Sequence, residues 1–231
     1  MATEPAPLTR RTLLPASAAT LLGLLATSRA GADEDVQPMA LASHFPQMPT
    51  GGHGVTPCGS YAPPAQIPSF GRIAPGDEPG EALEITGVVY ATDRKTPAPD
   101  IVVFAYHTDR RGLYNTPNSP FRPRLFGWVK SDAQGRYGFR TIKPAPYPQL
   151  DTPAHIHASL FSPSVPEYWI DDYWFAGDPL ITPHQRSLLT GRGGGGETLS
   201  LVRGADGVLR GRRNLMLGKV KISGGCRLFK T

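Results

Sequence analysis

Residues 154–161 read AHIHASLF, and a short apolar segment of this kind that follows a proline is typical of a β-strand. Glycine (26) and proline (25) together make 51 of the 231 residues and separate such segments from one another. After residue 32, no stretch sustains a 3.6-residue apolar period for three turns. The sequence therefore predicts an all-β domain, an antiparallel β-sandwich, with further strands at 84–91, 101–107, 125–131, 137–142 and 168–175.

The chain divides into three parts by composition. Residues 1–32 have the features of an export signal, and residues 33–80 are rich in proline and glycine. We expect this second part to be an extended N-terminal arm that wraps the sandwich or a partner subunit. Residues 81–231 carry the strands and are long enough for one domain with a sizeable core. The glycine run at 191–196 lacks the Lys-Ser/Thr ending of a phosphate-binding loop, so we interpret it as a tether between strands.

The export signal rests on three features in a fixed order. Arg10 and Arg11 precede an apolar run at residues 16–26, and small residues at 30–32 form a cleavage site. This arrangement resembles a twin-arginine signal, so the mature chain should begin near Asp33 in the periplasm or outside the cell. The apolar run is shorter than the roughly 20 residues of a membrane span. We therefore expect no integral membrane segment in the mature form.

The net charge and the cysteine content of the chain limit the kinds of molecule that it can bind and the bonds that it can form. Removing residues 1–32 lowers Lys+Arg from 24 to 21 and Asp+Glu from 19 to 18, which leaves a net charge of +3. This mild and scattered charge argues against nucleic acid. Cys58 and Cys226 match no metal-binding spacing. They either form one disulfide between the arm and the C-terminal end or stay reduced. Assembly into a homo-oligomer is also left open.

Two histidines in the first-quoted segment suggest a metal site. His155 and His157 project from the same side of a strand while Ile156 points to the other. Tyr147 stands between two prolines, which make a stiff corner for its phenol. Phenolate is a hard oxygen donor, so its presence favours ferric iron over the zinc or copper that suits imidazole alone. The competing interpretation is that the histidines are ordinary core or surface residues.

The motifs around these residues resemble the intradiol ring-cleavage dioxygenase family. The similarity covers about 100 of the 231 residues in family order. It includes residues 85–90 (ITGVVY), 97–114, Gly127-Trp128, 132–144, the Pro-Tyr-Pro and Pro-Ala-His-Ile-His elements, and residues 177–180 (GDPL).

The resemblance implies a ferric ion held by Tyr114, Tyr147, His155 and His157, with O2 and a catechol-type substrate whose ring opens to a cis,cis-muconate-type diacid. Tyr147 would be both a ligand and the base that takes up a substrate proton. The remaining phenols and imidazoles have no partner at ligand spacing: we expect Tyr106 and Tyr137 in the core, His107 in the cleft or in solvent, and His44, His53 and His184 in irregular stretches.

Two residues depart from the family pattern. Thr152 stands where the family usually has an arginine, and Asp172 stands where it usually has a glutamine. We place both with Tyr147 among the catalytic residues and expect them to make the pocket less positive. Two alternatives stay open. One is a non-catalytic, transthyretin-like binding module, suggested by Gly87-Val88-Val89, and the other is an iron-binding relative with altered chemistry.

Overall fold

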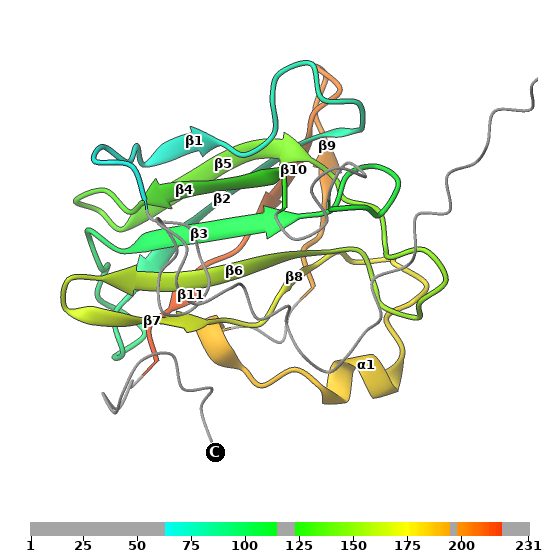
Figure 1. Ribbon diagram of the computed structural model, residues 1–231. Helices are drawn as coiled ribbons and strands as arrows, with labels where there is room; N and C mark the ends of the chain where they lie inside the picture. The colour runs from blue at the N-terminus through cyan, green and yellow to red at the C-terminus, as the bar shows by residue number, and fades with distance from the viewer. Residues whose placement is uncertain (1–62, 115–122, 195–197, 219–231) are drawn as a thin grey trace, which may run out of the picture. The chain divides into compact units, whose positions relative to one another are not determined.

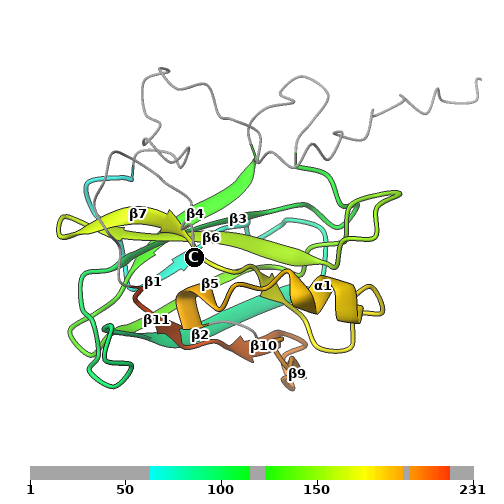
Figure 2. The ribbon, with the colours of Figure 1, turned by 90° about the horizontal axis from the view of Figure 1, so that it is seen from below.

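The protein folds into two packed β-sheets with little helix (Figures 1 and 2). The computed structural model describes residues 63–114, 123–194 and 198–218. One sheet has the order β1 (Phe70–Arg72), β5 (Arg136–Ile142), β2 (Ala82–Tyr90), β10 (Leu209–Arg212), β9 (Val202–Arg203), and β11 (Leu215–Met216) also pairs with β2. The other has the order β4 (Leu125–Lys130), β3 (Val102–His107), β6 (His155–Ser162), β7 (Val165–Trp169), and β8 (Tyr173–Trp174) also pairs with β6. The prediction of an all-β sandwich is confirmed.

The two sheets differ in strand direction. Every pair in the sheet of β3 and β6 is antiparallel, as predicted. In the other sheet β1 runs parallel to β5, and both β10 and β11 run parallel to β2. Those three strands are therefore an exception to the antiparallel prediction. None of the three is next in sequence to the strand that it pairs with in parallel, so no hairpin imposes an antiparallel direction on that pair.

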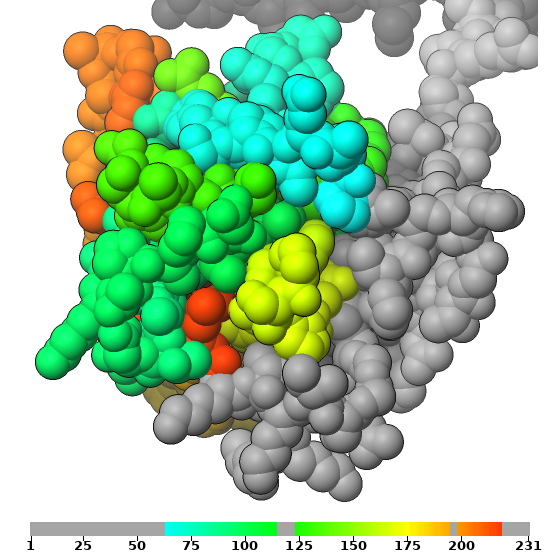
Figure 3. Space-filling model, turned by 90° about the vertical axis from the view of Figure 1, so that its left-hand side faces the viewer, coloured from blue at the N-terminus to red at the C-terminus, as the bar shows by residue number. Residues whose placement is uncertain are grey.

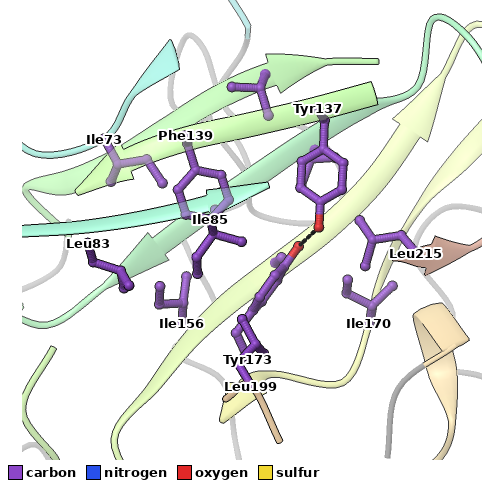
Figure 4. Close-up of a cluster of buried hydrophobic side chains, with 14 of the residues drawn as sticks. Ile73, Leu83, Ile85, Tyr137, Phe139, Ile156, Ile170, Tyr173, Leu199 and Leu215 are labelled. Atoms are coloured by element: carbon purple, nitrogen blue, oxygen red, sulfur yellow. Dashed lines mark hydrogen bonds between the residues drawn. The ribbon is translucent and has the colours of Figure 1, made fainter. Parts of the chain in front are cut away.

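The core lies between the sheets and follows from strand alternation. In β2 every second residue is buried, including Leu83, Ile85 and Val89 at 0% exposure. These side chains meet Phe139 from β5 and Ile156 from β6 (Figure 4). Such a layer of aliphatic and aromatic side chains supplies most of the folding free energy of a sandwich.

The register places two sets of turns at opposite ends of the sandwich. Val102, at the start of β3, pairs with Lys130 at the end of β4 and with Phe161 near the end of β6. His107, at the other end of β3, pairs with Ile156 near the start of β6. The connections that precede β6 and follow β3 therefore meet at one end, and Figure 3 shows the opposite end.

Two segments differ from their predicted form. The single strand predicted at 168–175 is divided into β7 and β8, because Asp171 and Asp172 between them bond to other parts of the chain. Within the predicted arm, Phe70–Arg72 forms β1 at the edge of a sheet. Between β8 and β9 the chain forms a short helix, α1 (Pro183–Ser187), and one 3-10 turn, η1 (Arg192–Gly194).

Several predictions lie outside the described residues. These are the signal at 1–32, His44, His53, the cysteines Cys58 and Cys226, and most of the arm at 33–80. Among the residues that are described, no helix has the length and apolar character needed to cross a membrane.

Candidate metal centre

Four side chains meet at the end of the sheet where β6 begins. Tyr114 follows β3, Tyr147 lies in the connection from β5 to β6, and His155 and His157 are the first and third residues of β6. Ile156 between them is fully buried in the core, so the two imidazoles share the opposite face, as predicted. The structure thus brings together the four donors that the sequence analysis selected.

The donor atoms of these side chains converge on one point. The Nε2 atom of His157 lies 2.9 Å from Tyr114 Oη, 3.2 Å from Tyr147 Oη and 3.0 Å from His155 Nε2. Tyr147 Oη is also 3.1 Å from His155 Nε2, and the two phenol groups are hydrogen-bonded to each other. Two ligands about 2 Å from one ion and 90–110° apart are separated by about 2.8–3.3 Å. The four distances fall within that range.

The hydrogen-bond partners of the Nδ1 atoms determine which nitrogen of each imidazole carries the proton. His155 Nδ1 lies 2.6 Å from the carbonyl oxygen of Pro153, and His157 Nδ1 lies 2.8 Å from Asp172 Oδ1. Both partners are acceptors, so each Nδ1 donates its proton to them. In the neutral form of each ring, Nε2 is then unprotonated and carries a free lone pair. Two lone pairs then face each other at 3.0 Å without a proton between them. A cation bound at this point removes the repulsion, so the donor set fits a metal ion.

Burial keeps the two phenols and the His155 imidazole neutral when no cation is present. It raises the pKa of Tyr114 well above 10, and the nearby Tyr147 and Tyr106 add to the increase. Burial likewise raises the pKa of Tyr147, against the hydrogen bond from Tyr114. It also lowers the pKa of His155 to about 4, with the neighbouring His157 adding to the decrease. A highly charged cation would displace the phenol protons and make both tyrosines anionic ligands.

Close packing of two loops holds the phenols in contact. Gly112 has a positive φ of 80°, and a Cβ there would lie 2.1 Å from the carbonyl oxygen of Pro146. The loop before Tyr114 therefore touches the corner that carries Tyr147. The carboxylate of Asp109 accepts the backbone N–H of Leu113 at 3.1 Å, which fixes the loop from within.

An aromatic cluster borders the centre on the outer face of the same sheet. The Tyr106 ring lies 4.7 Å from the His157 ring and 5.7 Å from the Tyr114 ring, centroid to centroid. Tyr106 is buried, as predicted, but in a cluster with Phe104 that is separate from the main core. Its contact with the centre was not predicted from the sequence. The cross-strand pairing of Tyr106 with His157 is the signal that would have revealed it.

Asp172 lies against His157 on the side away from the other donors. Its carboxylate and one nitrogen of each histidine lie within 4.8 Å of one another, but it contacts Nδ1 rather than Nε2. Burial by itself would raise the pKa of Asp172. The interaction with His157 outweighs that effect and holds the pKa of the Asp172 carboxyl below its usual value. Asp172 therefore forms a hydrogen bond with His157 and is not itself one of the four residues whose donor atoms converge.

Thr152, the other departure from the family pattern, is half-buried three residues before His155. The hydrogen bonds found among the described residues do not join it to the four donors. Two basic side chains have partners of their own: Arg124 makes two bonds to Glu78 at 2.5 and 2.6 Å, and Lys143 Nζ lies 5.9 Å from the Phe175 ring centroid.

The other singled-out residues lie apart from the four donors. His107 is fully buried between the sheets, so the expectation that it faces the cleft or solvent is wrong. Its Nε2 bonds to Thr141 of the other sheet, which explains why an imidazole is tolerated there. Tyr137 is in the core, as predicted, and His184 is exposed on α1.

Comparison with known sequences identifies the family of the chain. Residues 62–188, more than half of the chain, match the family model described as Dioxygenase. The β chain of protocatechuate 3,4-dioxygenase from Burkholderia cepacia is 32% identical over 117 residues, 46% of this chain and 49% of that one. Catechol 1,2-dioxygenase 2 from Acinetobacter lwoffii is 28% identical over 144 residues, 50% of this chain and 52% of that one. The chain spans about half the length of these curated relatives.

Solved structures show the same fold. An intradiol ring-cleavage dioxygenase from Tetranychus urticae has a TM-score of 0.52 at 16% identity, over 71% of this chain and 93% of that one. The 3-chlorocatechol 1,2-dioxygenase from Rhodococcus opacus 1CP has a TM-score of 0.51 at 22% identity, over 73% of both chains. With the family match over residues 62–188, these findings show that the chain belongs to the intradiol ring-cleavage dioxygenase family.

Proposed function

We propose that the protein is a non-haem ferric dioxygenase that opens a catechol-type ring between its two hydroxyl-bearing carbons with O2. The observation that carries this proposal is the convergence of two phenol oxygens and two imidazole nitrogens, with four of their separations between 2.9 and 3.2 Å. Tyr114, Tyr147, His155 and His157 would hold the ion. Two phenolate donors favour ferric iron over zinc. The bound ion would supply Lewis acidity and a common binding point for the substrate.

Tyr147 is suited to move a proton. Its Oη lies within hydrogen-bond distance of both Nε2 atoms and of the Tyr114 phenol, on a corner between Pro146 and Pro148. As a phenolate it would accept the proton of a catechol hydroxyl at Oη. The burial that raises its pKa then favours the neutral phenol once the charge of the cation is shared with the substrate.

The charges around the centre favour a neutral ring. Asp172 brings a carboxylate next to His157, while Arg124 is already paired with Glu78. Thr152 has no charge to offer to a substrate carboxylate. We therefore propose that uncharged catechols, including hydroxylated and alkylated ones, are better substrates than protocatechuate.

Metal content and turnover test the function together. The purified protein should contain about one ferric ion per chain, show a visible tyrosinate-to-iron band and convert catechol to a cis,cis-muconate-type diacid. Visible resonance Raman should lose one set of tyrosinate modes in Tyr114→Phe and another in Tyr147→Phe. Tyr168→Phe, which alters a buried phenol on β7, is the matched control. A colourless zinc protein would exclude the assignment. Absence of metal would favour the binding module, and iron without turnover the altered chemistry.

We also propose that the protein acts in the periplasm or outside the cell. The support is the order of Arg10-Arg11, the apolar run and the small residues at 30–32. The twin-arginine route carries folded proteins, which suits an enzyme that loads iron before export.

A further inference from the structure

The two imidazoles of the metal centre differ in what stands behind them. His155 donates its Nδ1 proton to a neutral backbone carbonyl, that of Pro153, at 2.6 Å. His157 donates its Nδ1 proton to a carboxylate oxygen of Asp172 at 2.8 Å. The His157 side chain is 9% exposed and that of Asp172 is 27% exposed, so the pair is shielded from most solvent. A hydrogen bond to a carboxylate is stronger than one to a carbonyl.

The sheet register holds this pair in place. β8 pairs with β6 so that Tyr173 stands opposite Ile156 and Trp174 opposite His155. Continuing the antiparallel register by one residue puts Asp172 opposite His157. Tyr173 points into the core, where it is fully buried and its phenol lies 3.0 Å from that of Tyr137. Because side chains alternate, anchoring Tyr173 inside directs Asp172 to the face that carries the donors.

We propose that Asp172 is a positioning residue that makes His157 the stronger of the two nitrogen donors and stabilises the ferric over the ferrous state. This inference rests on the proposed function. The hydrogen bond selects the tautomer with a free Nε2, and the negative charge increases electron density on that nitrogen. Two phenolates and Asp172 together balance the three positive charges of a ferric ion. The glutamine that the family usually has at this position would leave the centre one unit more positive.

Two substitutions separate the hydrogen bond from the charge. Asp172→Asn keeps an oxygen that can accept from Nδ1 but removes the charge, and Asp172→Ala removes both. Asp171→Asn is the matched control. Its carboxylate is one residue away, buried, and accepts the N–H of Gly191 at 2.6 Å, away from the donors. The three variants and the parent, all in the ferric form, should be compared by visible spectrum, reduction potential and iron retention against a chelator.

We expect Asp172→Asn to raise the reduction potential and shift the tyrosinate-to-iron band to longer wavelength, because a ferric ion without the nearby anion is easier to reduce. Asp172→Ala should show the same changes and bind iron about 10–100-fold more weakly. Asp171→Asn should leave the band and the potential unchanged.

The result also separates this inference from the proposed function. A parent protein without a tyrosinate band would overturn the function itself. A parent with the band, whose position and potential are unchanged in both Asp172 variants, would overturn the role of Asp172 alone. Equal changes in the Asp171 and Asp172 variants would mean a general structural effect, and that outcome would overturn it as well.

Discussion

His107 joins the two sheets of the sandwich through Thr141. Its Nε2 lies 2.5 Å from Thr141 Oγ1 on β5, and its Nδ1 donates to the carbonyl oxygen of Thr108 at 2.7 Å. Because Nδ1 carries the proton, Nε2 accepts from the threonine hydroxyl. Both ring nitrogens are satisfied in the neutral form, and a second proton would place a positive charge inside the core.

This arrangement predicts a loss of stability in acid. Burial lowers the pKa of His107 from 6.5 to about 4, so the unfolded chain takes up the proton first as pH falls. The stability contributed by the neutral imidazole is complete above pH 6.5 and is lost between pH 6.5 and 4. From pH 7 to 5 the expected loss is about 2 kcal/mol. Urea unfolding of His107→Gln should show lower stability at pH 7 but a flatter pH dependence. His184→Gln, on the exposed helix, should keep the parent slope, and an unchanged slope in His107→Gln would refute the assignment.

Gly112 should be essential to the metal centre. An added Cβ would lie 2.1 Å from the Pro146 carbonyl oxygen, and neither backbone can move away without separating the Tyr114 and Tyr147 loops. We expect Gly112→Ala to lose the tyrosinate band and more than about 3 kcal/mol of stability. Gly177→Ala has a similar positive φ of 85° but nothing within 4 Å of its Cβ. It should lose only about 1–2 kcal/mol and keep its iron. Equal iron content in both variants would contradict the prediction.

We expect the buried side chain of Arg213 to destabilise the folded protein. Its three guanidinium nitrogens are buried without a hydrogen-bond partner among the described residues, and the Tyr173 ring, 4.3 Å away, and the charge of Asp172 offset only part of that cost. A desolvated cation–π contact contributes about 2 kcal/mol, whereas each unsatisfied buried donor costs about 1–3 kcal/mol. We therefore expect Arg213→Met to raise Tm, by about 2–4 °C for each kcal/mol gained. Arg212→Met on the exposed side should change little. A clear fall in Tm would show that the guanidinium has a partner.

The preference among substrates should depend on the charge that each substrate carries. A unit charge about 6 Å from a substrate carboxylate, at an effective dielectric near 20, contributes roughly 3 kcal/mol before screening. Half of that is a tenfold preference. We expect kcat/KM to be higher for catechol and hydroxyquinol than for protocatechuate. Asp172→Gln combined with Thr152→Arg should shift the ratio towards protocatechuate. If protocatechuate is already the best substrate, another basic group must reach the ring, with Lys143 or Arg122 (outside the described residues) as candidates.

Export should depend on the arginine pair. Replacing Arg10 and Arg11 by lysine should leave the precursor in the cytoplasm with its dioxygenase activity intact, because the change lies outside the predicted domain. Fractionation followed by an activity assay measures this directly. Continued export of the double variant would indicate the general secretory route.

Local features of the chain were readable from the sequence alone. Short apolar segments between glycines and prolines predicted six strands, and strand alternation predicted that His155 and His157 share a face. The corner at Tyr147 follows from its two flanking prolines. These predictions succeed because backbone geometry over a few residues depends mainly on those residues.

Contacts between distant segments were decided only by the tertiary structure. The sequence contains no physical reason for Tyr114 to meet Tyr147, which is 33 residues away. It placed a negative charge at Asp172 but could not show that the carboxylate binds His157 Nδ1. It also left His107 facing cleft or solvent, whereas Thr141 of the other sheet holds it inside. Such contacts depend on the paths of long connections and on the register between strands, and neither is encoded in a short stretch of residues.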